Sequence, residues 1–457
     1  METLRVLSPT AILGYGFPME SFMRGMEQHP HAIAVDAGST DPGPYYLGAG
    51  YSFTDRMAVK RDLQIMISAA LSEGIPVIIG SAGGCGGEPH LEWTLKIIRE
   101  IAEENGFTFK MATVHAEIPK DIVLERMRRG KVAPLSPAPE LTEKELEHTV
   151  RVVGQMGVEP FIKALETGAQ VIVAGRAYDP AVFAALPVQK GYDKALAIHM
   201  GKILECACIA AVPGSGSDCI IGSIRGDAFT VEPLNPGRKC TTLSVAAHTL
   251  YEKTNPYLLP GPGGTLNLTE TEFIQETDRR VQVRGSRYAA SDSYQVKLEG
   301  VKRIGFRTLS IAGTRDPNMI RSIDEVVEGV RERVADNFKQ SSLDYYLDFK
   351  IYGKNAVMGP LEPLRKTQSH ELGVIIEAVA KDQEMADTIC SFARSTMLHY
   401  GYEGRVSTAG NLAFPYSPSD FKAGGVYAFS VYHLMDVSDP CELFPMEIEV
   451  VGRREKE

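Results

Sequence analysis

Several features that define large classes of protein are missing from this chain or scarce in it. No apolar run reaches the roughly 18 residues that a membrane-spanning helix needs, and the first residues lack the charged and apolar regions of a secretory signal. Lys and Arg number 48 against 58 acidic side chains, and the formal net charge of −10 argues against a nucleic acid or an anionic membrane as partner. We therefore expect a cytoplasmic protein that binds a small molecule, and we expect it to be a homo-oligomer.

Motifs for common cofactors and nucleophiles are missing as well. The seven cysteines form no CxxC pair and there is no HExxH, so we expect reduced thiols and no zinc site. The chain has no GxGxxG, Walker A or GxSxG sequence, and thus no signature of a nicotinamide cofactor, a P-loop nucleotide or a serine nucleophile. The cofactor stays unknown, although a divalent cation could be held by Asp36, Asp41 and Glu205.

The first half of the chain alternates short, continuous apolar runs with segments of helical spacing. The runs are residues 32–35, 76–79 and 171–174, and the helical segments include 55–72, 92–105 and 159–167. Apolar strands separated by amphipathic helices are typical of a parallel sheet that is buried on both faces. The sequence therefore predicts an α/β domain with a mostly parallel sheet and helices on both faces.

The second half differs in pattern. Residues 225–315 contain alternating segments, such as 294–298 and 303–307, which predict antiparallel strands. A strand over 373–380, a helix over 382–400 and a strand over 425–434 predict a small α+β domain. The segment 358–363, which contains Pro and Gly, is the best linker, so we divide the chain into domains 1–364 and 365–457.

Polar loops follow the predicted strands. Asp36 ends the first strand and precedes a loop with Ser39 and Thr40, at the strand end where α/β proteins bind ligands. This loop could hold an anion, or even a phosphoryl group, but a plain Asx-type turn explains it equally well. The next loop carries five glycines, among them Gly83 and Gly84, beside Ser81, and leads into a helix, an arrangement suited to an anion such as a carboxylate.

Further candidates lie at the third strand end and on the helices after it. Arg176 could hold a carboxylate with Asp179 as its orienting partner, or the two could form a structural ion pair. His199 and Lys202 share one helix face, with Glu205 beside it, and could supply acid and base groups. A half-buried helix with a satisfied histidine is the simpler alternative. His248 lies on a later predicted helix capped by a threonine.

These motifs, in this order, resemble the acyclic terpene utilisation (AtuA-like) family. The resemblance is carried by residues 81–84, 175–179, 199–206, 240–241 and 247–252 and covers most of residues 1–350, while 431–440 resembles the ferredoxin-like domain that accompanies the family. It implies an α/β domain followed by a ferredoxin-like domain. Members that are placed in pathways act in the breakdown of branched acyl-CoA or carboxylate compounds.

Two functions follow from these observations. The first is a hydratase/lyase or isomerase acting on a small carboxylate or acyl-CoA thioester, in which Arg176 and the glycine amides hold the substrate oxygen. Glu205 or His199 would remove a proton, Lys202 or His248 would return one, and Asp36 is a further acid/base candidate. The second is a non-catalytic subunit that docks a partner protein through a sheet edge near residues 425–434.

Overall fold

The computed structural model describes residues 2–251, 255–339 and 344–452, and the chain forms two compact units. Unit 1 comprises residues 1–302 and 429–457, and unit 2 comprises residues 303–428. The sequence placed the boundary at 364/365 instead. The predicted linker, 358–363, lies between strands β16 and β17 inside unit 2, so its Pro and Gly residues belong to a loop within that unit.

Unit 1 contains a ten-stranded mixed sheet in the order β12-β13-β9-β8-β1-β2-β3-β7-β4-β19. Its strands are β12 (Glu272–Gln275), β13 (Val281–Arg284), β9 (Ala228–Pro233), β8 (Ile220–Arg225), β1 (Leu4–Ser8), β2 (Ala32–Asp36), β3 (Val77–Gly80), β7 (Val171–Ala174), β4 (Phe109–Val114) and β19 (Met446–Val451). The strands from β1 to β4 in this order pair in parallel, while those on either side pair antiparallel. The parallel core confirms the α/β prediction, but the whole sheet is mixed rather than mostly parallel.

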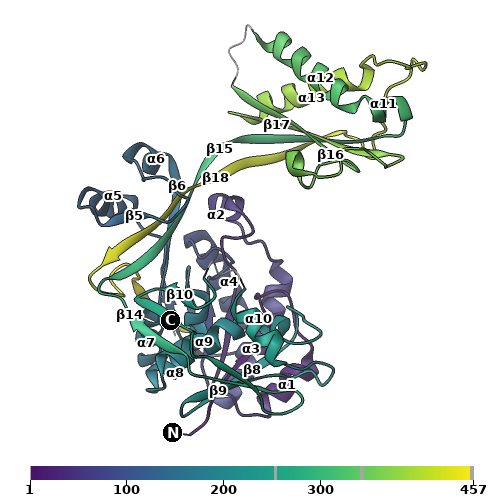
Figure 1. Ribbon diagram of the computed structural model, residues 1–457. Coiled ribbons are helices and arrows are strands. Elements are labelled where there is room, and N and C mark those ends of the chain that lie inside the picture. Colours follow the sequence, from purple (N-terminus) through teal and green to yellow (C-terminus); the bar gives the residue numbers. More distant parts are fainter. Residues whose placement is uncertain (1, 252–254, 340–343, 453–457) are drawn as a thin grey trace. The chain divides into compact units, whose positions relative to one another are not determined.

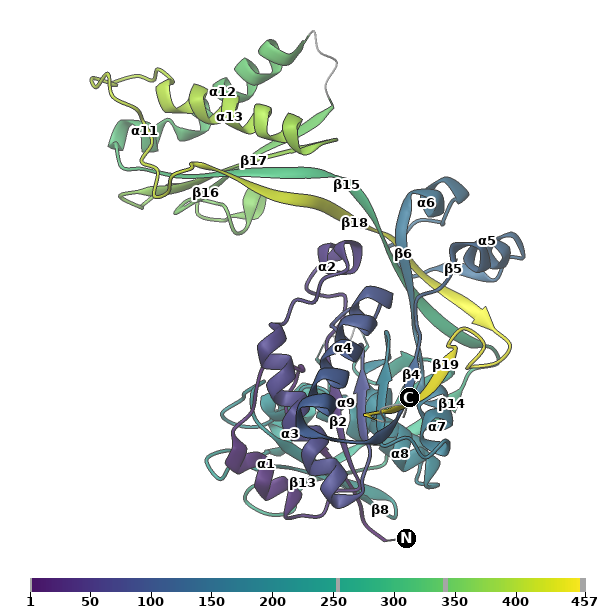
Figure 2. The same ribbon diagram turned by 180° about the vertical axis from the view of Figure 1, so that it is seen from behind.

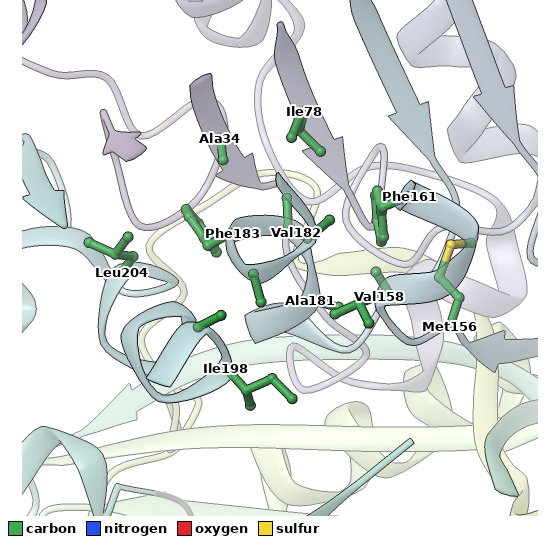
Figure 3. Packing of buried hydrophobic residues seen from close by; sticks show 14 of the residues in the cluster. Ala34, Ile78, Met156, Val158, Phe161, Ala181, Val182, Phe183, Ile198 and Leu204 are labelled. Atoms are coloured by element: carbon green, nitrogen blue, oxygen red, sulfur yellow. The ribbon is translucent and has the colours of Figure 1, made fainter. Parts of the chain in front are cut away.

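Helices cover both faces of the parallel core (Figures 1 and 2). Helices α3 (Arg56–Glu73) and α4 (Glu88–Asn105) pack on one face, and α7 (Val158–Glu166), α8 (Asp179–Gln189) and α9 (Lys194–Leu204) pack on the other. All residues of β2, β3 and β7 are buried, which explains their continuous apolar sequences. Figure 3 shows the second of these layers, where Phe161 and Phe183 lie below Ala34 and Ile78 of the sheet.

The remaining elements of unit 1 are shorter. They are α1 (Met19–Met26), α2 (Pro44–Ala49), α5 (Lys120–Arg128), β5 (Val132–Pro134), α6 (Glu143–His148), β6 (Thr149–Gln155), η1 (Ala207–Ala210), α10 (Thr242–Thr249), β10 (Leu258–Gly261), β11 (Gly264–Asn267) and β14 (Arg287–Ala290). Strands β10, β11 and β14 form a small antiparallel sheet. None of the described helices is long and apolar enough to cross a membrane.

Two long strands, β15 (Tyr294–Thr314) and β18 (Asp420–Val437), run from unit 1 into unit 2. The segments 294–298 and 303–307, which the sequence suggested as separate strands, are parts of the single strand β15. In unit 1, β15 pairs with β6, and residues 433–435 of β18 pair with β5. Of the edge predicted for partner docking, residues 425–434, only 433 and 434 are covered by β5, and docking along the rest stays a prediction.

Unit 2 contains the remaining parts of β15 and β18 together with α11 (Pro317–Arg321), α12 (Ile323–Phe338), β16 (Tyr345–Tyr352), η3 (Gly359–Leu361), β17 (Leu372–Ala380) and α13 (Gln383–His399). The strands lie in the order β16-β17-β15-β18. Buried residues of α12 and α13 share a core with β16 and β17, among them Val330, Ile389, Phe349 and Ile376. The predicted α+β composition of the C-terminal part is confirmed.

Candidate functional site

Three polar loops lie side by side where neighbouring strands of the parallel core end. Asp36, the last residue of β2, is in register with Gly80, the last residue of β3. The amide of Ser81 donates to the carbonyl of Gly175 (3.0 Å), which joins the loop after β3 to the loop after β7. Because parallel strands bring their carboxyl ends to one edge of a sheet, Asp36, Ser81 and Arg176 meet there.

Arg176 is the centre of a buried hydrogen-bond network. Its Nε donates to Glu299 (2.8 Å), and its Nη1 donates to the Ser81 hydroxyl (3.1 Å) and to Asp179 (2.9 Å). The side chain is only 3% exposed, so two carboxylates compensate its charge away from bulk water. Nη2 makes no hydrogen bond within the described part of the chain, so this nitrogen can still donate to a bound anion.

Glu299 is a member of this network that the sequence analysis missed. Its carboxylate also accepts from Lys297 (2.7 Å). Burial alone would raise the pKa of Glu299, but Arg176 and Lys297 outweigh it and lower this pKa to about 2. The sequence signal for Glu299 was an acidic residue beside the apolar Leu298 in a strand of alternating pattern. Its partner, Arg176, could not be identified from it, because Arg176 lies 123 residues away in the chain.

The carboxyl of Asp36 is buried at the end of β2. It is 6% exposed, and its Oδ1 has no hydrogen-bond partner among the residues that the structure describes. Burial, followed by the nearby charges of Asp179 and Glu205, raises its pKa well above the ordinary value, although Arg176 and the Ser81 hydroxyl oppose the shift. The neutral acid is therefore favoured, and the carboxyl could donate a hydrogen bond or its proton to a ligand.

Lys202 and Glu205 form a buried ion pair at the C-terminal end of α9. The Lys202 ammonium donates to Glu205, and both side chains are nearly inaccessible. Burial lowers the pKa of Lys202, but the Glu205 carboxylate more than compensates and raises it overall. The ammonium also lies 5.7 Å from the centre of the Tyr251 ring. Lys202 is consequently a protonated donor beside the carboxylate of Glu205.

His248 lies beside this ion pair as a neutral imidazole. Burial, and then the charge of Lys202, lowers its pKa to about 4. Its Nε2 is buried and has no hydrogen-bond partner within the described ranges, and its ring stacks on Tyr251 with centroids 5.8 Å apart. At neutral pH this group can donate or accept a hydrogen bond, but it does not carry a transferable imidazolium proton.

His199 differs because the protein already engages both of its ring nitrogens. Nδ1 is 2.8 Å from the Ser286 hydroxyl, and Nε2 is 3.0 Å from the Thr249 hydroxyl. Burial lowers its pKa to about 3. The ring also contacts Phe229 and Phe273 edge to face. These contacts suit a histidine that holds α9 against its neighbours, as in the simpler alternative considered from the sequence.

The glycines of the loop after β3 pack closely against other parts of the protein. A Cβ added at Gly83 would lie 2.7 Å from His90, and one added at Gly84 would lie 2.5 Å from the ring of Phe53. The Gly84 amide donates to the Ser81 carbonyl (2.9 Å), so it is used within the loop. Burial raises the pKa of Cys85 to about 12, which keeps this thiol protonated. Ser81 is the residue of the loop that reaches the Arg176 network.

A cleft of about 860 Å³ lies beyond Glu299 in unit 1. The loop after Asp36 reaches it: Thr40 lines the cleft, while Ser39 donates from its hydroxyl to Asp41 (2.8 Å). The residues that line the cleft are Thr40, Asp41, Ser136, Pro137, Ala138, Pro139, Glu140, Thr142, Glu145, Lys297, Glu299, Phe429, Ser430, Val431, Tyr432 and His433.

The structure thus gathers most, but not all, of the candidate residues. Its central cluster consists of Asp36, Ser81, Arg176, Asp179, Lys202 and Glu205, with His248 next to Lys202. The ring of His199 instead bonds to two hydroxyls elsewhere. No group of three or more His, Cys, Asp or Glu side chains suited to a metal ion occurs in the described ranges.

Comparison with protein families gives a match over well above half of the chain. The family model described as acyclic terpene utilisation family protein AtuA matches residues 50–215 and 222–416. Searches of curated proteins and of solved structures found no match. The matched ranges include Ser81, Arg176, Lys202 and Glu205, while Asp36 precedes them.

Proposed function

The chain belongs to the acyclic terpene utilisation family, and from this premise we propose that it is an enzyme acting on a small carboxylate or acyl-CoA thioester. The proposed chemistry is that of a hydratase/lyase or an isomerase, by general acid/base catalysis. The observation that carries the proposal is the buried Asp36 carboxyl, whose Oδ1 is unsatisfied within the described chain and whose pKa is raised. Such a carboxyl is costly for stability and typical of acid/base sites.

In the proposed reaction, Nη2 of Arg176 binds the carboxylate or thioester oxygen of the substrate. A base removes the proton from the carbon next to this carbonyl, and the negative charge that moves onto the oxygen is stabilised by Arg176. Glu205 is the proposed base, because His199 is held by two hydroxyls. Asp36, whose raised pKa favours the neutral acid, is proposed to donate a hydrogen bond or its proton to the oxygen on which the charge develops. A positioned acid/base group of this kind contributes about 10²–10⁴-fold to a rate.

The second proton transfer is assigned to Lys202. In a lyase its ammonium protonates the leaving hydroxyl, so that water and an unsaturated product form; in an isomerase the proton is returned to a different carbon. Lys202 is proposed for this role because it is protonated and Glu205 holds it in place; its raised pKa makes it a weak acid, so the transfer depends on that placement. His248, neutral with a pKa of about 4, is proposed to position the substrate by a hydrogen bond.

The test is the exchange of the substrate's α-proton with solvent deuterium. A panel of branched acyl-CoA thioesters and free carboxylates is incubated with the protein in D2O and followed by proton NMR. We expect exchange with at least one compound and a loss of 100-fold or more in Asp36→Asn, with Asp278→Asn, at an exposed position outside the cluster, as the control that retains exchange. No exchange with any compound would favour the non-catalytic alternative, and full exchange by Asp36→Asn would remove Asp36 from the mechanism.

We also propose that unit 2 is a ferredoxin-like domain. Its chain order, β15-α12-β16-β17-α13-β18, follows the βαββαβ pattern of that fold, and the strand order β16-β17-β15-β18 supports the same assignment. A solved structure of residues 303–428 within the full chain would test the assignment by the direction of β18 relative to β15.

A further inference from the structure

We propose that a polar groove on the open face of the ten-stranded sheet binds a phosphate monoester of a hydroxylated compound, such as a sugar phosphate. The groove has a volume of about 400 Å³ and lies within unit 1, over strands β1, β8, β9 and β13. The residues that line it are Thr3, Arg5, Gln28, Ile221, Ser223, Arg225, Asp227, Ala228, Thr230, Glu232, Glu276, Arg280 and Gln282. None of them belongs to the acid/base cluster, so the groove is a second site that does not depend on the proposed function.

A row of hydrogen-bonding side chains crosses the floor of this groove. Arg5 of β1 is opposite Ser223 of β8, Ser223 is opposite Thr230 of β9, and Thr230 is opposite Gln282 of β13. Directly opposite residues of antiparallel strands point to the same face of a sheet, so these four side chains lie side by side. The other face of β8, β9 and β13 is buried against α9. None of the four side chains has a hydrogen-bond partner in the part of the chain that the structure describes, so all four can bind a ligand.

Two arginines at one end of the row carry uncompensated positive charge. Arg225 lies two residues after Ser223 on β8, so its side chain leaves the same face of the sheet, diagonally across from Arg5. Neither guanidinium forms an ion pair within the described ranges. Like charges on neighbouring strands reduce stability unless an anion lies between them. Because two guanidinium forks offer two positive charges, a doubly charged phosphate suits them better than a singly charged carboxylate.

The carboxylates of the groove leave this positive charge in place. Arg280 forms ion pairs with Glu232 (2.7 Å) and Glu276 (3.4 Å), so the charges of these three residues largely cancel. Only the carboxylate of Asp227 then stands against the two guanidinium groups of Arg5 and Arg225. The end of the groove at β1 and β8 is therefore suited to an anion.

The rest of the lining selects the body of the ligand. The described lining residues include no aromatic side chain and only two apolar ones, Ile221 and Ala228. A nucleobase would have no ring to stack on, and a hydrocarbon chain would find little apolar surface. The hydroxyl of Thr230 and the amide of Gln282 instead offer hydrogen bonds to hydroxyl groups of the ligand. A phosphate bound by Arg5 and Arg225 would place the hydroxylated part of the same molecule along this row.

The groove and the acid/base cluster lie at opposite ends of the parallel strands. The amide of His31, directly before β2, donates to the carbonyl of Arg5 (2.8 Å), whereas Asp36 is the last residue of β2. From Ala32 to Asp36 the strand extends about 13 Å. A phosphate ester in the groove is therefore a second ligand and not the substrate of the cluster.

The test is isothermal titration of the full chain with glucose 6-phosphate, inorganic phosphate and glucose at constant ionic strength. We expect glucose 6-phosphate to bind, inorganic phosphate to bind at least about fivefold more weakly, and glucose to give no measurable binding. Arg5→Gln and Arg225→Gln should each weaken binding of the ester by at least about tenfold. Arg284→Gln is the matched control, because Arg284 is an exposed arginine of β13 that pairs with Glu272 outside the groove. Thr230→Val should weaken binding of the ester but not of inorganic phosphate.

Three results would overturn the proposal: no binding of the ester, an equal loss in Arg284→Gln, or binding of inorganic phosphate as tight as that of the ester. Asp36→Asn should bind the ester as the unmodified protein does, and a loss there would place the phosphate in the acid/base cluster instead. Arg225 is exposed, so its variant should melt at the temperature of the unmodified protein. If Arg5→Gln melts lower, Arg225→Gln decides. The deuterium exchange is measured without phosphate esters of sugars, so its outcome is independent of this one.

Discussion

Replacing Glu299 by Gln should destabilise unit 1 strongly, and the loss should disappear in acid. The carboxylate accepts hydrogen bonds from Arg176 (2.8 Å) and Lys297 (2.7 Å) and is almost completely buried. The glutamine side chain has nearly the same shape but no charge, and its amide NH₂ would face one of the two cations. Arg176 would keep Asp179 as its remaining carboxylate partner.

The magnitude follows from the change in pKa on folding. A carboxyl whose pKa falls from 4.5 to about 2 on folding contributes about 3 kcal/mol to the free energy of unfolding. Removing one partner of a buried ion pair typically costs a similar free energy of unfolding, about 3–5 kcal/mol. Because the folded-state pKa of Glu299 is the lower one, this contribution is complete above the unfolded-state pKa of 4.5 and is lost as the pH falls towards 2.

The assay is urea unfolding of the unmodified protein and Glu299→Gln at a series of pH values. The single tryptophan, Trp93 on α4, reports on unit 1 by its fluorescence. We expect a difference of about 3 kcal/mol at pH 7 that shrinks below pH 4.5. Glu103→Gln, at an exposed position of α4, should change little. A difference below about 1 kcal/mol at pH 7, or one independent of pH, would refute the buried network.

Three further outcomes are expected. Gly86→Ala should lower the free energy of unfolding by at least about 2 kcal/mol more than Gly106→Ala. Both glycines have φ of +66°, but only at Gly86 would an added Cβ meet another group, the backbone nitrogen of Arg176, at 2.1 Å. Equal urea midpoints of the two variants would contradict this. Cys85, buried with a pKa of about 12, should resist iodoacetamide at pH 8 until the protein unfolds, as judged by mass spectrometry. The pKa of His199 falls from 6.5 to about 3 on folding. Its contribution should therefore lower the free energy of unfolding by about 1.4 kcal/mol for each unit by which the pH falls below 6.5. Urea titrations of His199→Gln should lack this contribution.

The parallel core could be predicted because its signal is local. Each of the strands β2, β3 and β7 is a short apolar run buried on both faces, and each ends directly before a polar loop. The rule that carboxyl ends of parallel strands meet then placed Asp36, Ser81 and Arg176 at the same edge. The side-chain roles assigned to these residues remain predictions.

What the sequence could not provide depends on contacts between distant segments. Glu299 meets Arg176 because β15 pairs with β6, and nothing near residue 299 indicates that register. The segments 294–298 and 303–307 were separated by a glycine and charged residues, yet one strand continues through them. The hydrogen bonds of the His199 ring could not be predicted either, because the hydroxyls of Thr249 and Ser286 lie 50 and 87 residues further along the chain.

The last strand of the ten-stranded sheet has a consequence for biosynthesis. Strand β19 covers the outer edge of β4 along six residue pairs, from Met446 opposite Val114 to Val451 opposite Phe109. While a ribosome is still translating the segments before β19, the backbone groups of β4 on that side have no strand to bond. An open, apolar edge of this kind promotes association between nascent chains. Chaperone binding should therefore be most important late in translation, until residues 446–451 leave the ribosome.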